Sequence, residues 1–257
     1  MKVVILCGGL GTRLREETEF RPKPLVEIGG RPILWHIMKT FGHHGLREFV
    51  LCLGYKGSLI KEYFLNYEAM NNDLEIHLGA RSTVKFLGEH TEQDYTVTLA
   101  DTGSAAMTGA RVKRVARHLG DRFMVTYGDG LANLDLPALL AFHASHGRLA
   151  TVTTVRMPGR FGVLDTSDEG RVQRFREKPV HDAWVSAGFF VFERRVLEYL
   201  SVDDACVLER EPLERLVSEG ELMAYRHGGD FYPMDTLRDH QALNELWQSG
   251  KASWKNW

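Results

Sequence analysis

An apolar strand followed at once by a glycine loop opens this chain and limits the folds that it can adopt. Residues 2–6 read KVVIL, a continuous and largely β-branched run that is typical of a strand buried on both faces. Residues 7–13 read CGGLGTR directly after it. Helical spacing over 33–44 and 58–69 then alternates with a second apolar run over 48–54. Strand, helix, strand and helix in this order predict parallel crossover units in an α/β domain.

The remainder of the chain predicts the same architecture with hairpins added at one edge. Residues 121–130 and 149–157 are expected to be strands, and residues 136–147 a helix. Residues 161–179 alternate in two arms around an Asp-Glu-Gly turn, which indicates a hairpin. No repeat period and no linker divides the chain. We therefore expect one domain, 1–257, with a mixed, mainly parallel, Rossmann-like sheet flanked by helices and carrying hairpin insertions.

The composition argues against two classes of partner. The 257 residues include 32 Lys and Arg against 34 Asp and Glu, a formal net charge of −2, so no overall positive charge attracts nucleic acid or an anionic membrane. No apolar run reaches the roughly 18 residues that a membrane span needs, and the first residues become glycine-rich too soon for a signal peptide. The odd set of Cys7, Cys52 and Cys206 indicates thiols in a reducing compartment. We expect a cytoplasmic protein without membrane or nucleic-acid partners.

Two familiar phosphate-binding loops do not match the glycine loop. The dinucleotide fingerprint G-x-G-x-x-G, started at Gly9, needs a third glycine where Leu14 stands, and the P-loop pattern has no match here. What remains is GGLGTRL followed by RPKPL, in which Arg13 offers a planar guanidinium and Lys23 a compact ammonium for phosphate oxygens. The prolines on either side of Lys23 stiffen that segment. The pattern indicates phosphate binding, and the alternative is a glycine turn beside a solvated basic loop.

Read together with RPKPLVEIGGRPIL, the glycine loop resembles the signature of the sugar-1-phosphate nucleotidylyltransferases. The resemblance continues through TYGDG (126–130), FREKP (175–179), AGFFVF (187–192) and YPMDT (232–236), and so spans nearly the whole chain. The segments LWHIMK, DTGSAAMTGARVKR and PMDTLRD are similar to the branch of that family that acts on CTP and glucose 1-phosphate. The resemblance implies an α/β catalytic domain that uses Mg²⁺ to form CDP-glucose and pyrophosphate. It also implies a homo-oligomer, a hexamer in this branch, that serves deoxysugar and lipopolysaccharide O-antigen synthesis.

In that family a sugar-phosphate oxygen attacks the α-phosphorus of the nucleotide, so the protein mainly positions two anions and neutralises charge. By resemblance, Asp129 of YGDG and Asp235 of PMDT hold Mg²⁺, and Lys23, Arg13 and Asp129 are the catalytic residues. Lys23 would contact the α-phosphate. Each aspartate also has a purely structural alternative, an Asp-Gly turn for Asp129 and the N-cap of the helix that starts at 236 for Asp235.

The resemblance further implies two sets of binding residues. The nucleotide would contact Leu6, Gly8, Gly9, Gly11, Thr12, Arg13, Lys23, Tyr55, Thr102, Gly103, Ser104, Arg111 and Gly128. The sugar phosphate would contact Glu177, Lys178, Ser186, Ala187 and Gly188. A solvated helix face is the alternative for Arg111, and a surface charge pair is the alternative for Glu177 and Lys178. Ser186-Ala187 stands where the branch has Asn-Gly, which leaves the choice of sugar open.

Two other functions remain open at this point. The same chemistry could use UTP, dTTP or another sugar phosphate, and the fold could serve as a non-catalytic nucleotide-sugar sensor. The histidines show no metal-ligand spacing. We expect Trp247, Trp254 and Trp257 to pack on the core or on a neighbouring subunit, because exposed tryptophans at a terminus favour association.

Overall fold

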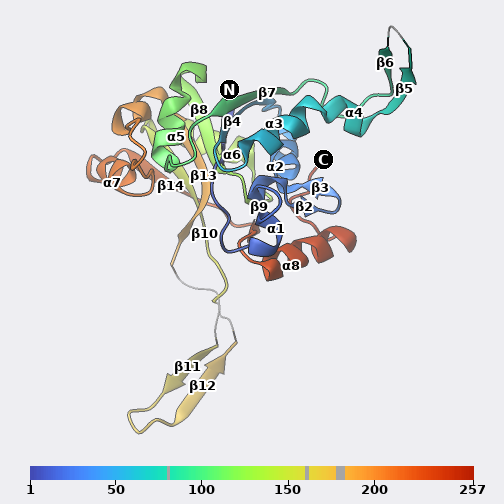
Figure 1. Ribbon diagram of the computed structural model, residues 1–257. Helices are drawn as coiled ribbons and strands as arrows, with labels where there is room; N and C mark the ends of the chain where they lie inside the picture. Colours follow the sequence, from blue (N-terminus) through green and yellow to red (C-terminus); the bar gives the residue numbers. More distant parts are fainter. Residues whose placement is uncertain (80–81, 160–161, 178–182) are drawn as a thin grey trace.

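A seven-stranded sheet forms the centre of the protein (Figure 1). The computed structural model describes residues 1–79, 82–159, 162–177 and 183–257. The strand order is β14-β10-β13-β8-β1-β4-β7. The strands are β1 (Lys2–Cys7), β4 (Glu48–Leu53), β7 (Thr96–Asp101), β8 (Arg122–Tyr127), β10 (Ala150–Val155), β13 (Val185–Glu193) and β14 (Leu222–Arg226).

The pairing directions make the sheet mixed and mainly parallel. Strand β1 pairs in parallel with β4 and β8, β4 pairs in parallel with β7, and β10 pairs in parallel with β14. Only β13 runs antiparallel to its two neighbours, β8 and β10, among the pairs of this sheet in the described residues. The predicted fold class is confirmed. The carboxyl ends of β1, β4, β7 and β8 meet at one edge, where α/β sheets bind ligands.

Helices cover both faces of the sheet. Successive β1 side chains point to opposite faces and belong to two separate hydrophobic clusters. Val3 and Ile5 pack with α2 (Ile33–His43), whereas Val4 and Leu6 pack with α5 (Thr108–Arg114) and α7 (Glu211–Ser218). Figure 1 shows α5 and α7 on one side, and α2 with α8 (Leu237–Gln248) on the other. The remaining α-helices are α1 (Arg15–Thr18), α3 (Gly57–Leu65), α4 (Tyr67–Asn71) and α6 (Leu136–His146). A 3-10 turn over Ala116–His118 follows α5.

Short two-stranded sheets complete the architecture. The predicted hairpin is present as β11 (Val163–Thr166) and β12 (Val172–Arg176). The others are β2 (Glu27–Ile28) with β3 (Arg31–Pro32), β5 (Asp73–His77) with β6 (Thr83–Leu87), and β9 (Gly130–Ala132) with β15 (Phe231–Pro233). The β5–β6 and β11–β12 hairpins project from the body of the protein (Figure 1).

The tryptophans of the C-terminal segment pack on the core. Trp254 is fully buried, and its indole N–H faces His36 of α2 at 3.4 Å. Trp247 and Trp257 also contact the ring of His36 edge-on or tilted. Of the two expected arrangements, the core or a neighbouring subunit, the structure shows packing on the chain's own core. Among the described residues, no helix has the length and apolar character to cross a membrane.

Candidate active site

Lys23 lies between two carboxylates at the ligand-binding edge of the sheet. Its Nζ donates to Asp129 Oδ2 at 2.7 Å and to Asp235 Oδ1 at 2.8 Å. The Lys23 side chain is only 10 % exposed. It belongs to the 3-10 turn Lys23–Leu25, which the extended Pro22 leads into and the ring of Pro24 stiffens. The ammonium is therefore held in place by the 3-10 turn that carries Lys23 and by the two carboxylates that it contacts.

A local strand pair explains how residues so far apart in the chain meet. Asp129 follows β8, and the chain then turns into β9, where Gly130 pairs with Pro233 of β15. The backbone N–H of Met234 also donates to the Asp129 carbonyl at 2.9 Å. Asp235 comes next in the chain, so the β9–β15 ladder places the two aspartates side by side.

Arg13 reaches the same cluster from the glycine loop. Its guanidinium donates to Asp235 Oδ2 at 2.9 Å, while its side chain remains 69 % exposed. Exposed ion pairs contribute little free energy, on the order of 0–1 kcal/mol. Arg13 can therefore exchange this carboxylate for a phosphate at small cost, whereas the Lys23 side chain is nearly buried and bonded to two carboxylates.

The Asp129 and Asp235 pair fits a small divalent cation. One oxygen of each carboxylate already converges on a cationic group, the Lys23 ammonium. Within the described residues, no cluster of three or more His, Cys, Asp or Glu side chains forms a larger metal site. Two carboxylates completed by substrate phosphates are what Mg²⁺ commonly uses, because it retains several water or phosphate ligands. The two aspartates are the residues that would hold it.

A cavity of about 290 Å³ opens beside this cluster. Its lining includes ten of the residues expected from the sequence: Leu6, Gly8, Gly9, Gly11, Thr12, Arg13, Lys23, Arg111, Gly128 and Asp129. It also includes residues that sequence reasoning missed: Cys7, Pro24, Ala106, Met107, Thr108 and Tyr127. Most of these residues lie inside or beside the motifs named above. Each motif therefore contributes more of the cavity wall than the sequence predicted.

The Cys7 thiol in this lining is not a reactive group. Burial, with smaller contributions from Cys52 and Asp129, raises the pKa of Cys7 well above its usual range. A thiol that stays protonated is a poor nucleophile. Cys7 therefore contributes packing to the wall of the cavity.

Arg111 organises the loops around the cavity. Its guanidinium donates to the carbonyls of Gly8 at 3.1 Å and Leu53 at 3.0 Å, and to the Thr102 hydroxyl at 2.8 Å. It also donates to the carbonyls of Gly103 and Ser104. Arg111 is 4 % exposed, so the solvated-face alternative is wrong. These bonds tie together the ends of β1, β4 and β7, and they explain the glycine at position 8, where a Cβ would lie 2.1 Å from the Arg111 guanidinium carbon.

Several predicted nucleotide contacts lie outside the cavity. Thr102, Gly103 and Ser104 surround the Arg111 guanidinium and are not among the residues that line it. Tyr55 lines a separate hollow of about 430 Å³ on the other flank of the glycine loop. Thr12 lines both spaces, so the glycine loop forms the wall between them.

The residues expected at the sugar phosphate lie in two places, with 186–188 at the start of β13 in the central sheet and Glu177 at the end of the separate β11–β12 hairpin. Gly188 has φ +76°, and a Cβ there would overlap the ring of Tyr127, so only glycine fits against this cavity wall. The Ser186 hydroxyl accepts from the backbone N–H of Gly188 at 3.2 Å, and Ala187 is buried. Glu177 follows β12, with its carboxylate against Gly162. Lys178 lies outside the described residues.

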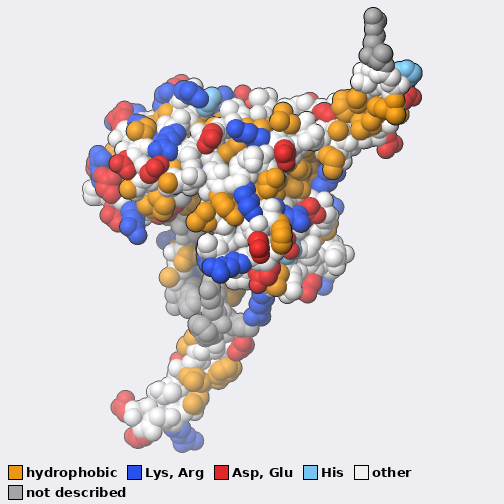
Figure 2. Space-filling model, in the orientation of Figure 1, with side chains coloured by type: hydrophobic (Ala, Val, Ile, Leu, Met, Phe, Trp, Pro, Cys, Tyr) orange, Lys and Arg blue, Asp and Glu red, His pale blue; other side chains and the backbone are white. Residues whose placement is uncertain are grey.

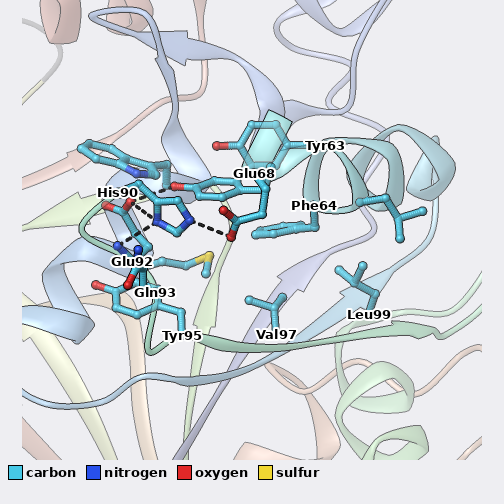
Figure 3. A pocket seen from close by; sticks show the side chains of 13 residues that line it. Tyr63, Phe64, Glu68, His90, Glu92, Gln93, Tyr95, Val97 and Leu99 are labelled. Carbon is cyan, nitrogen blue, oxygen red and sulfur yellow. Dashed lines mark hydrogen bonds and ion pairs between the residues drawn. The ribbon is translucent and has the colours of Figure 1, made fainter. Parts of the chain in front are cut away.

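A second cavity, of about 320 Å³, differs in chemistry (Figure 3). It is lined by Tyr63, Phe64, Tyr67, Tyr95, Val97 and Leu99 and by neighbouring residues of α2, α4 and the loop before β7. The buried carboxylate here, Glu92, already pairs with Lys39 at 3.0 Å and accepts from Tyr67 at 3.2 Å. A mainly aromatic cavity whose lining includes the carboxylates of Glu68 and Glu92 suits phosphates poorly. The cavity beside Lys23, lined by the glycine loop and Arg13, is therefore the better candidate for a nucleotide site.

Comparison with known proteins identifies the family of this chain. A sequence model described as nucleotidyl transferase matches residues 2–236. The chain is 51% identical over 260 residues to the glucose-1-phosphate cytidylyltransferase of Salmonella typhi, with 100% of both chains covered. It is 32% identical to the mannose-1-phosphate guanylyltransferase of Mycobacterium tuberculosis, over 86% of this chain and 57% of that one.

A solved structure of similar fold is HddC from Yersinia pseudotuberculosis complexed with GMP-PN. It superposes with a TM-score of 0.68 at 21% identity and covers 96% of this chain and 99% of that one. At that identity the likeness concerns the fold alone. The family match extends over most of the chain and through the Lys23, Asp129 and Asp235 cluster. The chain belongs to the nucleotidyl transferase family.

Proposed function

We propose that this protein transfers the cytidylyl group of CTP to α-D-glucose 1-phosphate, giving CDP-glucose and pyrophosphate. The observation that carries the proposal is the 51% identity over full length to the glucose-1-phosphate cytidylyltransferase of Salmonella typhi. The site supports it, because a caged lysine, two paired aspartates and a glycine loop provide the groups that in-line nucleotidyl transfer requires.

Lys23 is the proposed electrostatic catalyst. In the described structure its ammonium is shared by Asp129 and Asp235. When the triphosphate enters, Nζ would turn to the α-phosphate, whose negative charge grows as the sugar-phosphate oxygen attacks. A cation positioned beforehand stabilises that charge without reorganisation at the moment of reaction. Arg13 and the amides of Gly8, Gly9 and Gly11 would hold the remaining phosphates.

Mg²⁺ is the proposed cofactor, held by Asp129 and Asp235. When bound it would neutralise charge on the substrate phosphates. The aspartates then serve two cations, since each keeps an oxygen within reach of Lys23. Their negative charge also orients the lysine before the substrate arrives.

The sugar phosphate is proposed to lie beyond the Asp129 turn, near the start of β13. Glu177 would accept hydrogen bonds from sugar hydroxyls, Lys178 would pair with the phosphate, and the segment 186–188 would line the pocket. Gly188 supports this placement, because its contact with Tyr127 joins the segment to the cavity wall. We also propose that the whole chain is one catalytic domain, that it forms homo-oligomers, and that it works in the cytoplasm in cell-surface polysaccharide synthesis.

Pyrophosphate release tests the proposal directly. The purified protein would be incubated with glucose 1-phosphate and Mg²⁺, and separately with CTP, UTP, dTTP, GTP and ATP. We expect release with CTP at least about tenfold faster than with the other four nucleotides. Preference for another nucleotide would overturn the choice of base. Absence of release with all five, also when other sugar phosphates are supplied, would favour a nucleotide-sugar sensor.

A further inference from the structure

Glu209 joins two parts of the cavity wall that come from different elements of the fold. Its Oε2 accepts from the Thr108 hydroxyl at 2.6 Å, and its Oε1 accepts from the Tyr127 hydroxyl. Thr108 begins α5 and Tyr127 ends β8, and both residues line the cavity beside Lys23. Glu209 is not one of the described residues that line this cavity. One carboxylate behind the wall therefore holds two hydroxyl groups that belong to it.

The partners of Glu209 set it apart from the acidic side chains around it. Figure 2 shows acidic side chains intermingled with lysines and arginines over the part of the surface that carries α5 and α7. One of these acids, Glu211, pairs with Arg215 across one turn of α7 at 3.4 Å, and both side chains are largely exposed. Such a pair contributes little free energy. The Glu209 carboxylate instead accepts from two neutral hydroxyls, and hydrogen bonds to a charged acceptor are short and comparatively strong.

The segment that carries Glu209 is bonded to the start of α5. The backbone N–H of Met107 donates to the Asp204 carbonyl at 2.9 Å. The Thr108 hydroxyl, which donates to Glu209, also accepts from the backbone N–H of Leu208 at 2.9 Å. Donor and acceptor sites of this hydroxyl are thus both occupied. Glu209 therefore projects from a backbone that is fixed relative to the α5 side of the cavity wall.

The other bond of Glu209 leads to the segment expected to bind the sugar phosphate. The ring of Tyr127 lies against Gly188, where a Cβ would come within 2.2 Å of the Tyr127 ring. Burial, with smaller contributions from the charge and the hydrogen bond of Glu209, raises the pKa of Tyr127. The phenol therefore stays protonated at neutral pH and remains a donor to Glu209. Through Tyr127, the carboxylate connects the start of α5 with the start of β13.

We propose that Glu209 is a positioning residue that fixes the spacing between the nucleotide side and the sugar-phosphate side of the cavity. The inference rests on the proposed function. In-line attack needs both substrates aligned, and a misplacement of about 1 Å can lower the rate on the order of 10²-fold. Glu209 acts through Thr108 and Tyr127 and takes no part in the bonds that form or break.

Two nearby substitutions test this role. E209A removes both hydrogen bonds, and E211A removes an exposed carboxylate from the same surface as the control. Steady-state pyrophosphate release should show kcat about 10–100-fold lower in E209A and within about twofold of the wild type in E211A. The KM for CTP should rise less than about threefold in E209A, because the glycine loop, Arg13 and Lys23 remain. E209Q retains one acceptor oxygen and should recover at least about threefold of the lost kcat. An unchanged kcat in E209A, or an equal loss in E211A, would overturn the proposal.

A double-mutant cycle separates positioning from a general structural effect. Y127F keeps the ring against Gly188 and removes only the hydroxyl. If Glu209 acts through that hydroxyl, Y127F/E209A should be within about twofold of E209A alone, since the two changes break one shared bond. Losses that multiply would show that Glu209 acts by another route. If E209A does not fold, Y127F and E209Q form the same cycle. An active wild type with an unaffected E209A refutes only this inference, whereas a wild type inactive with every nucleotide and sugar phosphate refutes the proposed function and this role with it.

Discussion

Lys23 is bonded to acids that lie 106 and 212 residues away in the chain, and this arrangement restricts where its ammonium can point. An ammonium on a surface loop would sample many directions and lose entropy on engaging a ligand. Here the 3-10 turn, the prolines beside it and the two carboxylates hold Nζ at the mouth of the cavity. The geometry favours a preorganised electrostatic role over a general attraction for anions.

Removing this ammonium is predicted to slow turnover strongly. K23A should lower kcat by roughly 10²–10³, the range for loss of one preorganised donor to developing charge. Steady-state pyrophosphate release measures it. K61A is the matched control, because Lys61 is exposed on α3 and touches no part of the cluster. A decrease smaller than tenfold in K23A would remove Lys23 from the catalytic role.

At the scale of an element, the start of α8 divides two tasks between neighbouring residues. One residue caps the helix, and the other contacts the charged groups of the candidate site. The N-cap of α8 is Thr236, whose side chain accepts from the Asp239 N–H, and Asp239 returns a bond to the Thr236 N–H. The interpretation of Asp235 as the N-cap is therefore wrong. Its carboxylate is directed to Lys23 and Arg13. Thr236 caps the helix, which leaves the Asp235 carboxylate to bond Lys23 and Arg13.

Substitutions at these two neighbouring residues should therefore affect different quantities. T236A should lower the free energy of unfolding, and D235N should lower kcat. T236A should lower the free energy of unfolding by about 1 kcal/mol, the usual cost of losing a cap, and keep most of the activity. D235N should keep the cap and lower kcat at least about 100-fold, because it weakens a metal ligand and a Lys23 partner. Chemical denaturation and pyrophosphate release measure the two quantities. Equal loss of activity in both variants would show that the assignment of roles is wrong.

At the scale of the whole molecule, the C-terminal segment closes over α2 through a histidine that must stay neutral. His36 is fully buried, with Nε2 at 2.8 Å from the Ile28 carbonyl and Nδ1 facing the Trp254 N–H at 3.4 Å. Only the tautomer with a proton on Nε2 satisfies both contacts. Burial lowers the pKa of His36 to about 4, since a charge there would lose its hydration.

Stability should consequently fall on mild acidification. Between pH 6.5 and about 4 the unfolded chain binds a proton at this histidine that the folded chain does not, so the free energy of unfolding falls as pH falls. The expected loss attributable to His36 is about 3 kcal/mol. Denaturant unfolding at several pH values measures it. H36Q should show a smaller slope than the wild type, and H77Q, altered on the exposed hairpin, should not. Identical slopes in all three proteins would refute the role of His36.

Features that depend on near neighbours in the chain could be predicted. The apolar run of β1, the helix α6 and the β11–β12 hairpin follow from periodicity and turn residues, which act over a few positions. The fold class and the family followed as well, because motifs spread along the whole chain point to one architecture. Lys23, Asp129 and Asp235 were also singled out from their motifs, and the structure places their side chains in contact.

Tertiary structure alone decided the contacts between distant segments. It made Arg111, which also lines the cavity, the tie between three strand ends, and it placed Thr102–Ser104 around that tie and outside the cavity lining. It buried Trp254 against His36 and left the apolar side chains of the β5–β6 hairpin exposed. Side-chain partners and burial depend on which elements become neighbours in space, and no local pattern records that. The sequence by itself determined the kind of fold and the chemistry available at the site, and packing determined which groups meet there.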